Sequence, residues 1–111
     1  MTDKALLKQF LFCAIMDEID DDKVLRMSAK NGHTHVVCVL LNRGVDVHTK
    51  NDYALRTSAE HGHTDVVKLL LDRGADVHAE DDEALLLSAK NGHLDVVQLL
   101  LDHGANVHAE E

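Results

Sequence analysis

Apolar and polar residues alternate along this chain in a pattern that recurs at a fixed period. Within residues 64–72, Val66, Val67, Leu70 and Leu71 recur at the i, i+3, i+4 spacing of a buried helical stripe. The same arrangement stands at 34–42 and again at 94–102, which gives a 30-residue period. The spacing predicts an amphipathic helix over each of these three segments.

A weaker apolar pattern precedes each of these helices. Leu55 and Ala59 give residues 53–60 a narrow apolar face, which predicts a first, shorter helix. Asp52 is the expected N-cap of this helix, and Gly62 is the expected stop. Each 30-residue unit therefore reads as a pair of helices.

The chain consists of about three and a half copies of this unit. The second and third copies are identical at 20 of 30 positions, and residues 4–15 match only the second helix. One helix pair cannot bury its apolar face alone, so the copies must stack. We expect a single all-α domain over residues 1–111, divided into a half-repeat or cap at 1–20 and full repeats at 21–50, 51–80 and 81–110.

One motif in the repeats points to a family. The pattern G-H-x-D-V-V-x-L-L-L-D-x-G-A-[DN]-V at residues 62–77 and 92–107 closely resembles the ankyrin repeat. The resemblance implies a helix-turn-helix solenoid that recognises another protein and catalyses nothing. It also implies a binding surface on the concave face, formed by first helices and connecting loops.

The chain departs from the usual ankyrin pattern in two ways. Its 30-residue repeat is shorter than the usual ankyrin repeat of about 33 residues. The missing residues fall in the connecting loop at 75–82, so we expect shortened loops. The usual T-P-L-H start is replaced by Y-A-L-R at 53–56, and short repeats of this type resemble those of giant-virus ankyrin proteins.

Positions that differ between the copies are candidates for partner recognition, because framework positions must stay alike for stacking. Tyr53 is the single tyrosine, and tyrosine is a frequent anchor at interfaces. The alternative is that these are surface residues that have drifted without a ligand. The predicted partner-binding residues are Lys23, Arg26, Lys30, Asn31, Tyr53, Arg56, Thr57, Glu60, His61, Glu83, Leu87, Lys90 and Asn91.

Charge narrows the class of partner. The formal net charge of −9 at pH 7 argues against nucleic acid and against an anionic membrane surface. Acidic residues gather at the loops, in residues 20–22, 80–83 and 110–111. Three interpretations stay open for them: a partner with a basic segment, a bound ion, or helix capping on a solvated edge.

Metal, cofactor and enzyme chemistry find no support in the motifs. Equivalent histidines in adjacent repeats lie roughly 10 Å apart, whereas zinc ligands lie about 2 Å from the metal. The Gly-His histidines match a family position that braces the turn by hydrogen bonding. Phosphate-binding and nucleophile-elbow motifs are missing, so we predict no enzyme and no cofactor.

The two cysteines form no disulfide framework, and the N-terminal residues do not read as a signal peptide. We therefore expect a cytoplasmic protein in a reducing environment, without a membrane span.

The last repeat offers an alternative function. Val97, Leu100 and Leu101 repeat the interior pattern unchanged, although a terminal repeat needs a polar outer face. An exposed apolar patch there indicates either self-association into a homo-oligomer or a chain that continues into further repeats.

Overall fold

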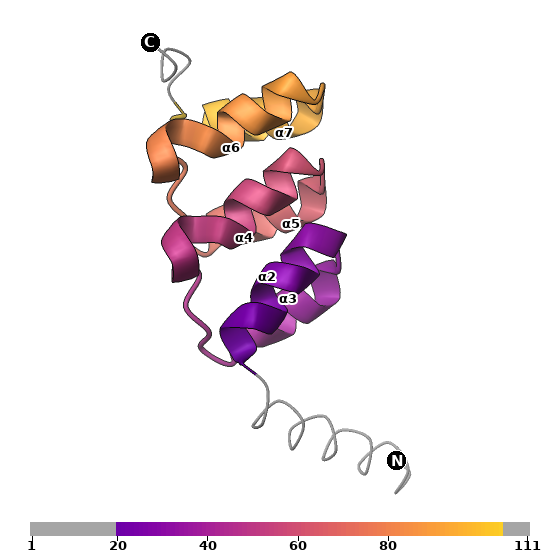
Figure 1. Ribbon diagram of the computed structural model, residues 1–111, viewed down its shortest axis with the longest axis vertical. Coiled ribbons are helices and arrows are strands. Elements are labelled where there is room, and N and C mark those ends of the chain that lie inside the picture. The colour runs from indigo at the N-terminus through magenta and orange to yellow at the C-terminus, as the bar shows by residue number, and fades with distance from the viewer. Residues whose placement is uncertain (1–19, 106–111) are drawn as a thin grey trace, which may run out of the picture.

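A computed structural model describes residues 20–105, which form three stacked helix pairs (Figure 1). The predicted half-repeat at 1–20 lies outside the described residues except for Asp20, and so do residues 106–111. The helices are α2 (Asp21–Asn31), α3 (Thr34–Asn42), α4 (Thr49–Glu60), α5 (Thr64–Asp72), α6 (Ala79–Lys90) and α7 (Leu94–Asp102).

The helices lie in two layers. The first helices α2, α4 and α6 pack side by side in one layer, and the second helices α3, α5 and α7 pack side by side behind them (Figure 1). All regular structure in residues 20–105 is helical. This confirms the predicted all-α architecture of stacked helix-turn-helix units.

The core is the aliphatic stripe that the sequence pattern predicts. Val66, Val67 and Leu70 are fully buried and Leu71 is 7% exposed. Complete burial of one such side chain contributes about 1.5–3 kcal/mol. Since α5 lies between α3 and α7, its apolar stripe is covered on both sides, which is why stacked copies are stable where one pair is not.

The second helix begins and ends where the pattern places it. The structure assigns α5 to Thr64–Asp72. Gly62 and Gly74, which bracket it, have φ values of 74° and 91°. Glycine adopts this left-handed conformation without steric cost, which ends one helix and redirects the chain into the next element.

The connecting loop holds a feature that the sequence does not predict. Helix α4 is assigned from Thr49, but Lys50, Asn51 and Asp52 have φ values of 56°, 58° and 58°. The right-handed helix therefore begins at Tyr53, as expected. The residues before it make one left-handed turn, and residues 80–82 repeat it before the right-handed part of α6. Left-handed residues other than glycine cost about 1–2 kcal/mol each, so contacts must hold this turn in place.

Candidate protein-binding face

The predicted partner-binding residues gather on the layer of first helices. In α2, Lys23, Arg26 and Lys30 follow the i, i+3, i+7 spacing that places side chains on one helical stripe. The equivalent stripes of α4 and α6 lie next to it, because these helices pack against one another. We call this surface the first-helix face.

Tyr53 stands at the start of the right-handed part of α4, the middle one of the three first helices, and lies between two arginines. The guanidinium carbon of Arg26 is 5.9 Å from the centre of the Tyr53 ring, and that of Arg56 is 5.5 Å from it. Both distances fall within the range of cation–π attraction. Arg26 belongs to the first repeat, so the Tyr53 side chain, which is half-buried, links two repeats.

Arg56 continues this chain of contacts into the third repeat. Its Nη1 donates to Oε1 of Glu83 at 2.7 Å, while Nε and Nη2 donate to the backbone oxygens of Asn51 and Lys50. Those two oxygens belong to the left-handed turn, so Arg56 also helps to hold the turn. Some positions therefore differ between the copies because they form pairs between one first helix and the start of the first helix in the next repeat.

The other predicted residues on α4 and α6 differ in accessibility. Thr57 is 3% exposed, because α4 is enclosed by α2 and α6. It is therefore not available to a partner in this conformation, which corrects its place in the predicted set. Leu87 is half-buried, whereas Lys90 is exposed.

The end of each first helix is braced by polar side chains. His61 donates from Nδ1 to the backbone oxygen of Thr57 at 2.8 Å, and its ring stacks on that of His63 with centres 6.1 Å apart. Asn91 donates from Nδ2 to the backbone oxygen of Glu60 at 2.9 Å. His61 and Asn91 remain exposed, but they also support neighbouring turns.

The histidines of the Gly-His turns connect successive repeats. His63 Nε2 donates to the backbone oxygen of Lys30 at 2.9 Å, which confirms the hydrogen-bonding role expected for this histidine. The ring lies so close to Gly32 that a Cβ there would be 2.6 Å from its Nδ1. His93 lies against Gly62 with the same spacing. Each contact needs a glycine, and we call the two contacts the His–Gly latches.

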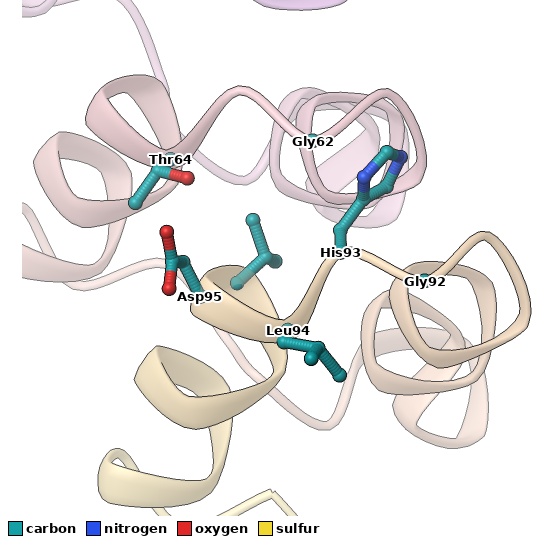
Figure 2. Close-up of a pocket in the computed structure, with 7 residues that line it drawn as sticks. Gly62, Thr64, Gly92, His93, Leu94 and Asp95 are labelled. Carbon is teal, nitrogen blue, oxygen red and sulfur yellow. The ribbon is translucent and has the colours of Figure 1, made fainter.

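A recess lies beside the second latch (Figure 2). Its volume is 340 Å³, and its lining residues are Gly62, Thr64, Gly92, His93, Leu94, Asp95 and Val96. Figure 2 shows the His93 ring reaching toward Gly62 and the Asp95 carboxylate facing Thr64. Leu94 is 75% exposed. None of the predicted binding residues lines this recess.

The predicted acidic edge contains an interaction that the sequence does not show. The Asp52 carboxylate is buried, and both of its oxygens lie 3.0 Å from Nδ1 of His48, which donates. Oδ2 also accepts from the backbone N–H of Asp76 in the next loop at 2.8 Å. Asp52 is thus a bridge between loops, which corrects its expected role as an N-cap. We call His48, Asp52 and Asp76 the loop clasp.

The carboxylates around His48 affect its protonation. The hydrogen bond to Asp52 raises the pKa of His48 above its usual value of 6.5, helped by the negative charges of Asp52, Asp46 and Asp76 and opposed by desolvation. His78 and Asp82 repeat the pair in the next loop, with Nδ1 3.0 Å from Oδ2. The exposed acidic edge is therefore smaller than the sequence suggests, because Asp52 and Asp82 are buried.

The surface predicted for self-association is only partly accessible. Leu100 is fully buried inside the third repeat, so its side chain is not part of the outer face. Val97 and Leu101 are half-buried and pack against the edge of the core. Their equivalents Val67 and Leu71 are buried, since the third repeat covers them.

Residues 20–105 were compared with the requirements for a metal site and for a membrane span. No group of three or more His, Cys, Asp or Glu side chains in this part of the chain is arranged to hold a metal ion. Every helix there is too short or too polar to cross a bilayer.

Comparison with known proteins identifies the family of this chain. The family model for ankyrin repeats, in three copies, matches residues 3–81 and 25–111, which together cover almost the whole chain. A search of curated proteins found no match.

Proposed function

The chain belongs to the ankyrin-repeat family, and on that premise we propose that it binds a protein partner through its first-helix face. Ankyrin repeats are in general protein–protein interaction modules, and the family is typically a scaffold without catalytic activity. The candidate contact residues are those that remain accessible on α2, α4 and α6.

One observation carries the choice of face. Tyr53 packs between Arg26 and Arg56 while part of its side chain stays accessible. A preorganised aromatic side chain loses little conformational entropy on binding, and Tyr and Arg are among the residue types most enriched at interface hot spots. Tyr53 is therefore the central anchor of the proposed interface.

A basic partner segment has its place at the loops rather than at Tyr53. Asp46, Asp76, Glu80 and Asp81 are exposed at this edge, whereas Asp52 is occupied by the loop clasp. The proposed basic segment lies along these exposed carboxylates, and its contribution falls as salt screens the attraction.

The proposal is tested by selecting a binding peptide from a display library and measuring its affinity for variants. Tyr53→Ala should weaken binding by about 10- to 100-fold, the range typical of a truncated aromatic anchor. Lys68→Ala is the matched control, because Lys68 is exposed on α5 in the other layer. Loss of affinity in the Lys68 variant, with Tyr53→Ala unchanged, would place the interface on the second helices and refute the proposal.

Self-association is the second candidate, and the apolar outer side of the third repeat favours it. Val97 and Leu101 occupy positions that the next repeat covers in the second copy. Light scattering after size exclusion, over a concentration series, should then show a dimer that Leu101→Lys abolishes. A constant monomer mass at all concentrations would exclude this candidate and leave the peptide-binding proposal intact.

A further inference from the structure

The first repeat presents a cluster of positive charge on a protein that is strongly acidic overall. Lys23, Arg26, Met27 and Lys30 occupy one stripe of α2, and three of the four are basic. Lys23, Met27 and Lys30 are exposed, and Arg26 is half-buried. The chain as a whole carries a net charge of −9. The local charge of this stripe is therefore opposite to that of the whole molecule.

The equivalent stripes do not share this character. Tyr53, Arg56 and Glu60 stand on α4, and their charges cancel. On α6 the matching charged residues are Glu83 and Lys90, which also cancel. The positive charge of the first-helix face is thus concentrated in the first repeat.

Arg26 differs from its counterpart Arg56 in one decisive contact. Arg56 forms an ion pair with Glu83 of the next repeat at 2.7 Å. The residue that matches Glu83 one repeat earlier is Tyr53, so Arg26 meets a ring instead of a carboxylate. Within residues 20–105 no ion pair satisfies its charge, and its buried Nε has no hydrogen-bond acceptor.

Arginine has five donors arranged to grip a carboxylate, and charge-assisted hydrogen bonds of this kind are the strong ones. The Arg56–Glu83 contact shows that a carboxylate fits beside the guanidinium at this position of the repeat. At Arg26 the Tyr53 ring holds the position that matches Glu83, but Arg26 is only half-buried, so a carboxylate supplied from outside can pair with the accessible part of its guanidinium.

An apolar side chain stands in the middle of the basic stripe. Met27 is 53% exposed, one of two large apolar side chains in the described residues with such exposure. Methionine adapts its shape to many apolar partners, which suits it to a binding surface. The acidic residues Asp20, Asp21 and Asp22 lie at the N-terminal end of α2, directly before Lys23. The cationic region is accordingly centred on Arg26 and Lys30.

We infer that the α2 end of the first-helix face binds an acidic partner segment, with a carboxylate at Arg26 and an aliphatic side chain against Met27. This inference rests on the proposed function and specifies the chemistry of the partner at that face. It differs from the basic partner that the overall charge favours, since a basic segment is confined to the loop edge.

The probe for this inference is a blocked pentapeptide, Glu-Glu-Leu-Glu-Glu, titrated into the labelled chain at low ionic strength and followed by amide NMR shifts. Shifts should concentrate in residues 23–30. Exposed charge pairs are individually weak, so the double variant Lys23→Gln/Lys30→Gln should bind on the order of tenfold more weakly. The double variant Lys50→Gln/Lys68→Gln removes the same charge at exposed sites elsewhere and should bind as the unmodified chain does.

A second pair of variants tests the role of Arg26 itself. Tyr53→Glu places a carboxylate at the position that Glu83 holds relative to Arg56, so it should occupy Arg26 and suppress probe binding. Tyr53→Gln removes the same ring without adding a charge, so it measures what loss of the ring alone costs, and Tyr53→Glu should bind the probe more weakly than Tyr53→Gln does. Equal binding by the two Tyr53 variants would overturn the carboxylate site at Arg26.

The outcomes separate this inference from the proposed function. Shifts spread evenly over the chain, or equal losses in the two lysine pairs, would overturn the acidic-segment inference. A selected protein ligand that needs Tyr53 but carries only basic residues would do the same while leaving the interaction module intact. A ligand insensitive to every first-helix variant would instead refute the proposed function.

Discussion

Gly32→Ala is expected to lower the free energy of unfolding by about 2–3 kcal/mol. Part of this cost is conformational, because Gly32 has a φ of 77° and an alanine there is strained by about 1 kcal/mol. The rest is steric. The new Cβ would lie 2.6 Å from the His63 ring, so the ring must move and its bond to the Lys30 carbonyl is lost, at about 1 kcal/mol. Urea unfolding followed by circular dichroism measures the difference.

Gly92→Ala supplies the matched control. Gly92 has a φ of 76°, almost the same as Gly32, yet nothing lies within 4 Å of a Cβ built there. This variant should lose only the conformational part, about 1 kcal/mol. Adding His63→Ala to Gly32→Ala should remove the clash, so the two changes should be non-additive. Equal costs at Gly32 and Gly92 would show that the His–Gly latch contributes nothing.

The sequence predicts the helices well because their signals are local. The stripe of Val66, Val67, Leu70 and Leu71, closed by Gly74, is complete within one segment, and the structure places α5 over the predicted residues. The start of the right-handed part of α4 at Tyr53 is predicted equally well. Periodicity and glycine positions report on the conformation of their own segment, so a single chain is enough to read them.

The left-handed turns escape prediction for a physical reason. Lys50 carries a side chain that ordinarily avoids positive φ, whereas Asn51 and Asp52 tolerate it better than most residues but usually as single residues, so the residue types do not predict three consecutive positive φ values. The stabilising contacts come from outside the segment: Arg56 donates to two of its carbonyls, and Asp76 donates to Asp52. Here contacts with other residues override the local preference for negative φ. Sequence patterns report only that local preference.

In the candidate site, too, local patterns predict some features, whereas others depend on contacts between repeats. Comparison of the copies singles out the variable positions on the first helices, but it cannot tell a position that binds a partner from one that pairs with the next repeat. Glu83 differs from Tyr53 because it pairs with Arg56 in the preceding repeat. Thr57 varies although it is buried. Variation becomes interpretable only when the contacting residue of the next repeat is known, as the contrast between Arg26 and Arg56 demonstrates.

The loop clasp stabilises the shortened loop between repeats. A 30-residue repeat lacks the usual start of the first helix, and its shortened loop runs through three left-handed residues. Asp52 stabilises this shortened loop in two ways. It tolerates the left-handed conformation better than most residues, and its carboxylate accepts hydrogen bonds from His48 and from the next loop. Buried between these partners, it should be one of the costliest loop residues to replace.

Asp52→Ala should therefore lower the free energy of unfolding by about 2–3 kcal/mol, through loss of the bond from the Asp76 N–H, the His48 pair and the left-handed tolerance of aspartate. Asp52→Asn keeps the shape and one acceptor oxygen, so it should cost only about 1 kcal/mol. The exposed Asp72→Ala is the control, within about 0.5 kcal/mol of the unmodified chain.

The cost of Asp52→Asn should also depend on pH. Because Asp52 raises the pKa of His48 above 6.5, the charged pair stabilises the fold fully below about pH 6.5 and loses this contribution as the pH rises through the raised pKa. The His48 side chain is 52% exposed, so solvent screening limits this part to about 0.5 kcal/mol. Unfolding curves at pH 6 and pH 8.5 should show the difference between the unmodified chain and Asp52→Asn shrinking at the higher pH. A difference that is constant, or that grows with pH, would mean that the charge on His48 does not support the clasp, leaving the Asp76 hydrogen bond as its main contact.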